Sequence, residues 1–518
     1  MARYKPYSYA QGKFIPIHFA KQILPGTFEY SLNHLIDHEL DLSLFDARFG
    51  NDQTGATAYD PRILLKIVLY AYSRGIVSSR KIEQACKENI IFMALSADTR
   101  PHFTTIADFI ASMDKEIIHL FRDVLLVCDD LGLIGKEMFA IDGCKMPSNA
   151  SKEWSGTRAD FEKKANKLEK AIGHIIATHR EQDRRQTDKD VVAREEQYVE
   201  TLRDRAKKIR EWLKDNDDKP GKTGKPKKSN ITDNESAKMK TSHGIIQGYD
   251  GVTAVDGKHQ IIVHAEAFGE AQEHDLLKPM LDGARENFQA IGKDENVFTK
   301  TKLSADSGFH TEENMKMLFS EEVDAYVADN LFRKRDPRFA GADRYRERHR
   351  KEREKLTGRK SGLFSSADFV FPEDLSYCLC PAGKRLYRSG NNVAVRNFLA
   401  TKFKGPKSAC VPCKLRTQCL RHPERTETRQ VAYFHGRSAK GKETFTEKMK
   451  RKIDSAAGRA LYSMRVAIAE PPFANICHIM GLDRFTLRGK KKVNIQWNLF
   501  CIVHNLKKVA RYGPSFAQ

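Results

Sequence analysis

Between residues 137 and 329 the sequence alternates short apolar runs with segments of helical spacing, and this alternation constrains the fold more than any other feature. The runs typical of strands are "EMFAID", "GIIQGYDGVTAVDGKHQIIVHAEAFG", "TKLSADSGF" and "DAYVAD". Asp256-Gly257 in the second run predicts a tight turn between two strands. The helical segments are "EHDLLKPMLDGARENF" and "TEENMKMLFSEE". The order strand, strand, strand, helix, strand, helix, strand predicts an α/β domain.

An aspartate ends two of these apolar runs, and a turn is expected after each, in "AIDG" and "ADSG". The succession of elements is also the chain order of an RNase H-like core, whose first and fourth strands are neighbours, so Asp142 and Asp306 would meet at one sheet edge. Neighbouring carboxylates repel unless a divalent cation lies between them. Magnesium suits such a site, and two ions about 4 Å apart assist in-line displacement at phosphorus. Alternatively Asp142 is only a turn residue, because Asp-Gly is a common turn dipeptide.

Residues 1–130 are predicted to be mostly helical. In "DPRILLKIVLYAYSRGIVSSRKIEQACKENIIFMALS" apolar residues at helical spacing precede a break at Gly75, and Ser78 or Ser79 could cap a second helix. Two helices that meet at a glycine turn are typical of a helix-turn-helix that reads DNA, and equally of an ordinary helical hairpin. A further helix is expected to begin at Thr104 or Thr105.

Two charged segments interrupt the remaining chain. Residues 151–230 are predicted to form a helical hairpin followed by a flexible basic linker. Residues 331–445 begin with a block in which thirteen Lys or Arg stand against five Asp or Glu between positions 333 and 360. This excess of one sign favours phosphate contacts over a solvated helix face. The arginines expected to make those contacts are Arg344, Arg346, Arg348 and Arg350.

The charge balance of the whole chain points to a polyanionic partner. The 518 residues include 89 Lys and Arg against 68 Asp and Glu, a net charge of +21, and such a chain most often binds nucleic acid, although a merely soluble basic surface is the alternative. A chain of 518 residues is expected to form two to four domains, and its 40% of hydrophobic residues can fill a substantial core. No apolar run approaches the roughly 18 residues of a membrane span, and the N-terminus lacks the apolar core of a signal peptide. We therefore expect a cytoplasmic, nucleoid-associated protein that does not contact membranes.

Several motifs together resemble bacterial insertion-sequence transposases of the DDE superfamily, in the branch with an InsH-like helical N-terminal domain. They are "DPRILLKIVLYAYSRGIVSSRKIEQAC", "AIDGCKMPSNASKE", "NITDNESAKMKTSHGIIQGYDG", "LSADSGFHTEENM", "LYSMRVAIAEPPF" and "DRFTLRGKKKVNIQWNLFCIVHNLKK". The resemblance implies a helical DNA-binding domain over residues 1–130 and an RNase H-like catalytic domain over residues 131–518, with the two charged segments as a helical insertion and a basic Cys-rich insertion.

The resemblance also implies an activity and its partners. The activity is metal-dependent cleavage and transfer of DNA strands, with Mg²⁺ or Mn²⁺ as cofactor. The partners are double-stranded DNA, at the terminal inverted repeats of the element and in the target, and a second copy of the chain. Asp142 and Asp306 would be the first two acids of the catalytic triad, and the third would be a glutamate on a late helix.

The family's late helix contains Tyr, Arg, Glu and Lys in that order, and Tyr462, Arg465 and Glu470 fit the first three. Four residues separate Arg465 from Glu470 where related transposases usually have three, which puts the two side chains about 140° apart on a regular helix instead of about 40°. Glu470 is the predicted third acid, with an exposed helix-end carboxylate as the alternative. Arg465 would bind a phosphate near the scissile bond, and Tyr462 would do likewise or pack internally.

The end of this helix departs from the family pattern. Pro471 and Pro472 could kink or end the helix. The lysine position falls near Cys477, so no lysine is assigned. Glu443 and Glu447 are weaker substitutes for the third acid.

A basic run close to the C-terminus and a cluster of cysteines complete the predicted sites. Arg488, Lys490, Lys491 and Lys492 are expected to contact the DNA backbone, with a solvated loop as the alternative. In "CLCPAGK" and "CVPCKLRTQC" a C-x2-C pair with further cysteines favours structural Zn²⁺, against an iron-sulfur cluster or free thiols. The predicted zinc ligands are Cys380, Cys410, Cys413 and Cys419.

Three functions are compatible with these features. The first is an active transposase. The second is a catalytically inactive, transposase-derived DNA-binding protein or repressor, favoured by the displaced Glu470 and the absent lysine. The third is a general nuclease on the same fold, which would cut DNA without regard to element ends.

Overall fold

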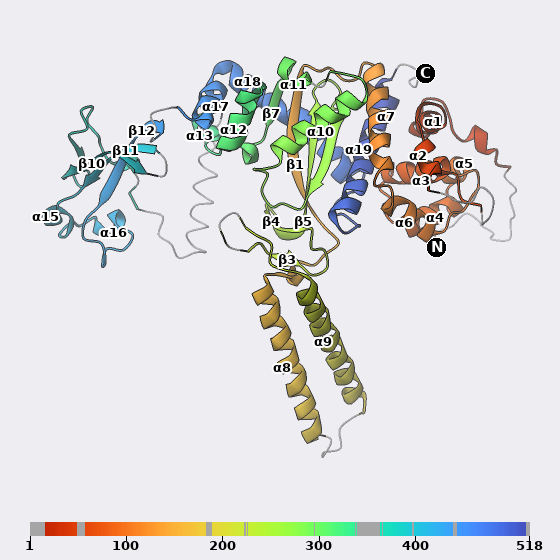
Figure 1. The fold of residues 1–518 in the computed structure, drawn as a ribbon, viewed down its shortest axis with the longest axis horizontal. Helices are drawn as coiled ribbons and strands as arrows, with labels where there is room; N and C mark the ends of the chain where they lie inside the picture. Colours follow the sequence, from red (N-terminus) through yellow and green to blue (C-terminus); the bar gives the residue numbers. More distant parts are fainter. Residues whose placement is uncertain are drawn as a thin grey trace, which may run out of the picture. The chain divides into compact units, whose positions relative to one another are not determined.

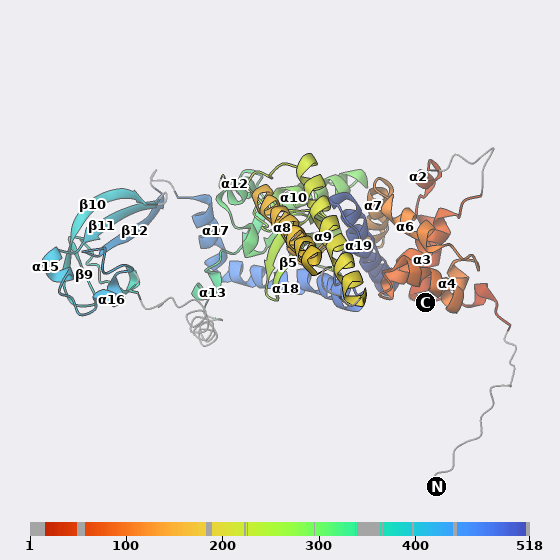
Figure 2. The same cartoon turned by 90° about the horizontal axis from the view of Figure 1, so that it is seen from below.

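The chain forms two compact units in the computed structural model (Figures 1 and 2). One unit comprises residues 1–305, 323–325 and 463–518, and the other comprises residues 306–322 and 326–462. The structure describes residues 16–48, 57–182, 189–221, 224, 226–294, 296–336, 338, 363–364, 366–395, 398–438 and 443–513.

A mixed sheet lies at the centre of the first unit, with the strand order β4-β5-β1-β7-β8 and with β6 also paired to β5. The pairs of β5 with β1, β4 and β6 are antiparallel, and the pair of β1 with β7 is parallel. The mixed α/β class predicted from the sequence is confirmed. A hairpin does follow Asp256, but residues 257–261 separate its two strands, so the connection is longer than the predicted tight turn. The strands are β1 (Met138–Pro147), β4 (Ala237–Thr241), β5 (Gly244–Asp256), β6 (Ile262–Phe268), β7 (Lys302–Ala305) and β8 (Asp324–Val327).

Helices cover both faces of this sheet. Successive strand residues face opposite sides. Gly251 of β5 faces Trp497 of α19 (Lys490–Tyr512), whereas His264 of β6, which pairs with Ala254, lies against Gly283 of the opposing helix α10 (Leu277–Ala290). The central strands are therefore buried on both sides, which explains their continuous apolar runs.

The strand β1 differs from its prediction. A turn was expected at Asp142-Gly143, but β1 continues to Pro147 because β5 pairs with it as far as that residue. Gly143 suits this position, since a Cβ atom there would lie 2.7 Å from Oδ1 of Asp250 on the neighbouring strand. Asp142 is thus a residue within a strand, and its interpretation as a turn residue is wrong.

The N-terminal part of the first unit is helical, as predicted, and packs on α19 through α1, α3 and α7. Gly75 has a left-handed φ of 76° between α3 and α4, and Ser78 is at the N-cap of α4. The helix expected from Thr104 or Thr105 begins instead at Phe103, with His102 as N-cap, and it ends at Ala111 before α7 begins. The elements are η1 (Phe19–Lys21), α1 (Phe28–His34), η2 (Leu35–Glu39), α2 (Ser43–Asp46), α3 (Pro61–Ser73), α4 (Ser79–Glu88), α5 (Ile90–Leu95), α6 (Phe103–Ala111) and α7 (Glu116–Asp130).

Two long helices, α8 (Arg158–Gln182) and α9 (Lys189–Asp215), lie side by side (Figures 1 and 2). They pack through an apolar cluster of Phe161, Ala165, Ile209, Trp212 and Leu213. The short elements beside this pair are η3 (Lys152–Trp154) and the two-stranded sheet of β2 (Ser155–Gly156) and β3 (Ser229–Asn230). The first unit also contains α11 (Val297–Lys300).

The second unit contains a small helical group. The carboxylate of Glu312 in α12 accepts hydrogen bonds from the backbone N–H groups of Phe445 and Thr446 at the start of α17. Arg335 pairs with both Asp329 and Asp454. The elements are η4 (Ser307–Phe309), α12 (Glu312–Ser320), α13 (Phe332–Arg335) and α17 (Phe445–Asp454).

An antiparallel sheet of order β12-β11-β10-β9, for which the sequence analysis assigned no strands, forms the Cys-rich part of the second unit. Its core contains Phe369, Cys378, Leu386, Phe403 and Val431. The elements are η6 (Ser366–Asp368), β9 (Tyr377–Leu379), β10 (Arg385–Val395), β11 (Phe398–Lys404), α15 (Lys407–Cys410), α16 (Arg416–Cys419) and β12 (Gln430–Ser438).

The late helix α18 spans Ala456–Ala474 and includes Pro471 and Pro472. The two prolines do not end it, and a π-helical turn, η7 (Asn475–Ile479), follows directly. Among all the helices within the described ranges, none is both long and apolar enough to cross a membrane.

Candidate active site and nucleic-acid contacts

The two predicted catalytic aspartates directly follow two residues that lie opposite each other in the pairing of β1 with β7. In the parallel pairing of β1 with β7, Ile141 lies opposite Ala305, the last residue of β7. Asp142 and Asp306 are the next residues of the chain. Oδ1 of Asp142 accepts a hydrogen bond of 2.9 Å from the backbone N–H of Gly143. The turn predicted after Asp306 is present as η4.

Arg465 of α18 pairs with Asp142. Its Nη1 donates a hydrogen bond to Oδ2 of Asp142, and the side chains of Arg465 and Asp142 are only 9% and 16% exposed. A largely buried charge requires an opposite charge beside it. The guanidinium of Arg465 therefore neutralises the first predicted catalytic acid.

Glu470 lies elsewhere on the same helix. Its side chain is exposed, whereas Arg465 is buried, as expected for two residues about 140° apart on a regular helix. Nowhere in the described ranges do three or more His, Cys, Asp or Glu side chains form a group that could hold a metal ion. The structure thus brings Arg465, and not Glu470, to Asp142.

The substitutes for Glu470 have structural roles in the second unit. Glu447 forms a capping box with Thr444 at the start of α17. Glu443 pairs with Arg451 at 2.5 Å.

Tyr462, which was predicted to bind a phosphate or to pack internally, packs against Phe332, with ring centroids 5.1 Å apart.

Two of the predicted DNA-contacting lysines are paired with carboxylates. Lys490 Nζ lies 2.8 Å from Glu266 and Lys491 Nζ lies 2.5 Å from Asp114, whereas Lys492 is exposed. Arg488 Nε donates a 2.7 Å hydrogen bond to the carbonyl oxygen of Asn149. The four arginines of the basic block, Arg344, Arg346, Arg348 and Arg350, lie outside the described residues.

A buried acid that the sequence analysis missed lies on the strand next to Asp142. Asp250 of β5 is fully buried, and its carboxylate lies close to that of Glu273. Burial, reinforced by the nearby Glu273 carboxylate, raises the pKa of Asp250 to about 7, although the Lys145 ammonium opposes this shift. Lys145 pairs with Glu273 at 3.0 Å. The signal in the sequence was one acid in the apolar run "GYDGVTAV".

The four predicted zinc ligands line one small cavity of about 30 Å³. Burial raises the pKa of the Cys419 thiol. In the described part of the chain these four thiols do not form a group that could hold a metal ion. The cavity lies beside the core of the small sheet, against which Cys380 and Cys419 also pack.

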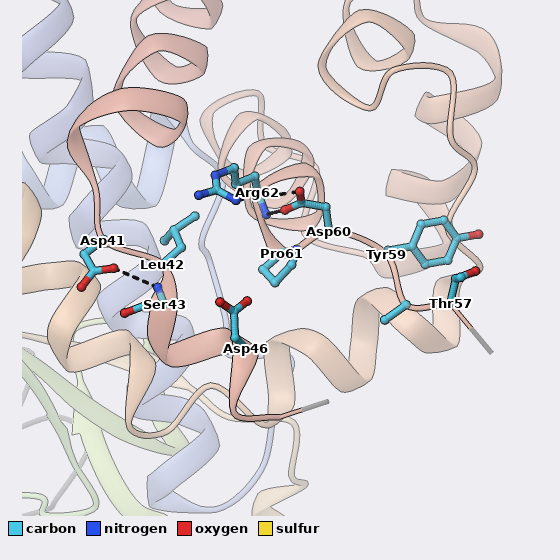
Figure 3. A pocket seen from close by; sticks show the side chains of 10 residues that line it. Asp41, Leu42, Ser43, Asp46, Thr57, Tyr59, Asp60, Pro61 and Arg62 are labelled. Carbon is cyan, nitrogen blue, oxygen red and sulfur yellow. Dashed lines mark hydrogen bonds and ion pairs between the residues drawn. The ribbon is translucent and has the colours of Figure 1, made fainter. Parts of the chain in front are cut away.

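An acidic pocket of about 610 Å³ in the helical N-terminal part contains Asp41, Asp46 and Asp60 (Figure 3). Two of these carboxylates have backbone partners. Asp41 accepts a hydrogen bond from the N–H of Ser43, and Asp60 caps α3 through the N–H of Arg62. The acidic character of this pocket opposes contact with DNA phosphates. Helix capping accounts for Asp60, and Asp41 holds the backbone just before α2.

Comparison with protein families gives two matches. Residues 18–112 match a transposase domain (DUF772), and residues 379–510 match a transposase DDE domain. Both families consist of transposase domains, which supports a transposase role for the chain. The two matches together assign it to the DDE superfamily of insertion-sequence transposases, as the motifs of the sequence predicted. Comparison with curated proteins and with solved structures gave no match.

Proposed function

We propose that this transposase cleaves DNA strands at the ends of an insertion sequence and transfers them to target DNA, in a metal-dependent reaction on an RNase H-like core. The strand order β6-β5-β1-β7-β8, with β5 antiparallel to both neighbours and β7 parallel to β1, supports that core. The observation that most supports the catalytic assignment is the pairing of Ile141 with Ala305, because an aspartate directly follows each residue.

We assign Asp142, Asp306 and Glu470 as ligands of Mg²⁺ or Mn²⁺. Carboxylate oxygens are the donors that magnesium prefers, so the donor type fits. When bound, the cation would activate the attacking oxygen and stabilise the leaving one. The described side chains do not form this group, and Glu470 in particular is turned away from Arg465 on α18.

Arg465 has two roles in this proposal. Without a cation it neutralises Asp142. Its planar fork also suits a phosphate, which it would bind beside the scissile bond. A DNA phosphate that attracts Arg465 would release the Asp142 carboxylate, so binding of DNA would favour binding of the cation.

The remaining assignments concern domains and partners. We propose a DNA-binding domain over residues 1–130, with α3 and α4 as its helix-turn-helix, and a catalytic domain over residues 131–518. The helical and the basic Cys-rich insertions would cover residues 151–230 and 331–445. Lys492 and the basic block would contact phosphates, a homodimer would hold two element ends, and zinc would stabilise the small sheet through its four cysteines.

Strand cleavage tests the catalytic assignment. The substrate is a duplex that ends in the terminal inverted repeat, incubated with Mg²⁺ or Mn²⁺, and the variants are Asp142→Asn, Asp306→Asn and Glu470→Gln. Each of the three should cut at least about 100-fold more slowly, because each loses a ligand carboxylate. Asp282→Asn, on the exposed side of α10, is the matched control. Full cleavage by Asp142→Asn or Asp306→Asn would overturn the assignment.

An inactive DNA-binding protein is the second candidate, and the exposed position of Glu470 is the observation that favours it. Such a protein would bind the terminal repeat and leave it uncut with either metal. Cutting of unrelated duplexes at the same rate as the terminal repeat would instead indicate a general nuclease.

A further inference from the structure

An open groove in the first unit is lined by basic side chains. Its volume is about 610 Å³, and it lies where β1 ends, between η3, α9 and the segment before α19. Four lining residues are cationic, and no lining residue is acidic. The cationic residues are Lys152, Lys208, Arg484 and Arg488, and all four are exposed.

The floor of this groove is held by buried hydrogen bonds. The carbonyl oxygen of Gln247 accepts a 2.8 Å bond from the N–H of Ser148. The side-chain amide of Gln247 accepts from the hydroxyl of Ser155 and donates to that of Ser236, both at 2.7 Å. A floor whose polar groups are satisfied in this way keeps its shape.

The four cations stay available for a ligand. In the part of the chain that the structure describes, no carboxylate forms an ion pair with Lys152, Lys208, Arg484 or Arg488. Arg484 and Arg488 donate to the carbonyl oxygens of Ser148 and Asn149, at 3.2 and 2.7 Å, and these bonds use only part of each guanidinium. This differs from Lys490 and Lys491, whose charges are already paired.

We propose that this groove binds the sugar-phosphate backbone of a DNA strand through Lys152, Lys208, Arg484 and Arg488. The inference rests on the proposed function of DNA cleavage and transfer, and it assigns a surface of the first unit to which the DNA would bind. A lining with four positive charges and no negative ones fits a polyanion. The groove is open to solvent, which suits a backbone on the surface of a duplex.

The position of the groove predicts which part of the DNA it holds. Pro147, at its edge, is five residues beyond Asp142 on β1, which corresponds to about 17 Å along a strand. A duplex has one phosphate per strand every 3.4 Å of its axis, so this length spans about five base pairs. The groove would therefore hold the backbone roughly five nucleotides from the scissile phosphate.

The salt dependence of DNA binding tests the proposal with the full chain. The principal variant is Lys152→Gln/Lys208→Gln. Among the described residues neither lysine donates a hydrogen bond to the protein, and Lys208 Nζ lies 5.5 Å from the centroid of the Trp154 ring in the same groove. Lys278→Gln/Lys300→Gln removes the same charge from exposed lysines outside the groove and is the matched control. Affinity is measured by fluorescence anisotropy over a range of salt concentrations, on a duplex with the terminal repeat and on an unrelated duplex.

We expect the groove variant to bind DNA roughly tenfold more weakly than the wild type. The slope of log affinity against log salt concentration should be smaller by about 2, because binding of the variant neutralises fewer phosphates and so releases fewer counterions. A loss on both duplexes supports binding of any DNA backbone, and a loss on the terminal repeat alone supports binding of the element end. Equal effects of the groove and control variants would overturn the proposal. A second variant, Arg484→Gln/Arg488→Gln, should reduce the slope in the same way.

The two proposals can fail separately. If the wild type cuts the terminal repeat while the groove variant keeps its affinity and salt slope, the groove proposal is wrong and the catalytic one stands. If the groove variant loses affinity while the wild type binds DNA without cutting it, the catalytic proposal is wrong and the groove remains a DNA-binding surface.

Discussion

The guanidinium of Arg465 donates a hydrogen bond to the carboxylate of Asp142, which precedes it by 323 residues in the chain. Both side chains are largely buried. Arg465 thus occupies the Asp142 carboxylate, which we also assign as a ligand of a divalent cation. A cation and Arg465 would therefore compete for Asp142, and the competition can be measured without catalysis.

Replacement of Arg465 by glutamine should make folding dependent on magnesium. The variant removes the guanidinium that pairs with the Asp142 carboxylate, which should lower the free energy of unfolding by about 2–3 kcal/mol in EDTA. Saturating Mg²⁺ should recover part of this loss, because the cation no longer has to displace a guanidinium. Chemical denaturation with and without Mg²⁺ measures both effects.

Arg465→Lys is the control, since it keeps the positive charge and loses the planar fork. It should resemble the wild type in its response to Mg²⁺. A stabilisation by Mg²⁺ that is the same in the wild type and in Arg465→Gln would contradict competition for Asp142.

Asp250 should make stability depend on pH. Burial raises its pKa from 3.8 to about 7, and the charged groups around it are Glu273, Lys145 and Asp142. The folded protein therefore holds this proton more tightly than the unfolded chain. The resulting stability is present below pH 4 and is lost as the pH rises through 7.

Asp250→Asn cannot ionise and should escape this loss. The variant should gain stability relative to the wild type between pH 4 and 7, to a plateau of no more than about 4 kcal/mol. Urea denaturation at several pH values measures the difference, with Asp282→Asn as the control that should show none. A difference between Asp250→Asn and the wild type that stays constant over this range would exclude Asp250 as the titrating group.

The cysteine-lined cavity should hold zinc in the purified protein. We expect about one zinc per chain by elemental analysis, and a loss of this zinc in Cys410→Ser/Cys413→Ser, which removes two of four thiolate ligands. Cys477→Ser, outside the cavity, should keep the metal. A wild-type protein purified without chelators that contains no zinc would show that these cysteines are packing residues.

The strands and helices between residues 137 and 329 were predictable because their apolar runs are long and the elements follow one another closely. The extension of β1 beyond Asp142 was not, since Gly143–Pro147 are not an apolar run and are extended only through pairing with β5. The small sheet of the second unit was missed for a similar reason. Its strands β10 and β11 have many polar residues, and their pairing depends on neighbours.

The candidate site was predictable in part. The spacing of Arg465 and Glu470 predicted that they face different sides of a helix, and their burial agrees with this. The contact of Arg465 with Asp142 could not be predicted, because no local pattern specifies which distant strand a helix face meets. The raised pKa of Asp250 depends likewise on burial and on Glu273 and Lys145, which come from separate parts of the chain.

Binding of Mn²⁺ to the complex with terminal-repeat DNA, followed by electron paramagnetic resonance, tests the central assignment most directly. If Asp142 and Asp306 share one cation, the wild type should bind Mn²⁺ tightly, and Asp142→Asn and Asp306→Asn should each lose that binding while they keep their affinity for DNA. Unchanged Mn²⁺ affinity in either variant would contradict the shared site.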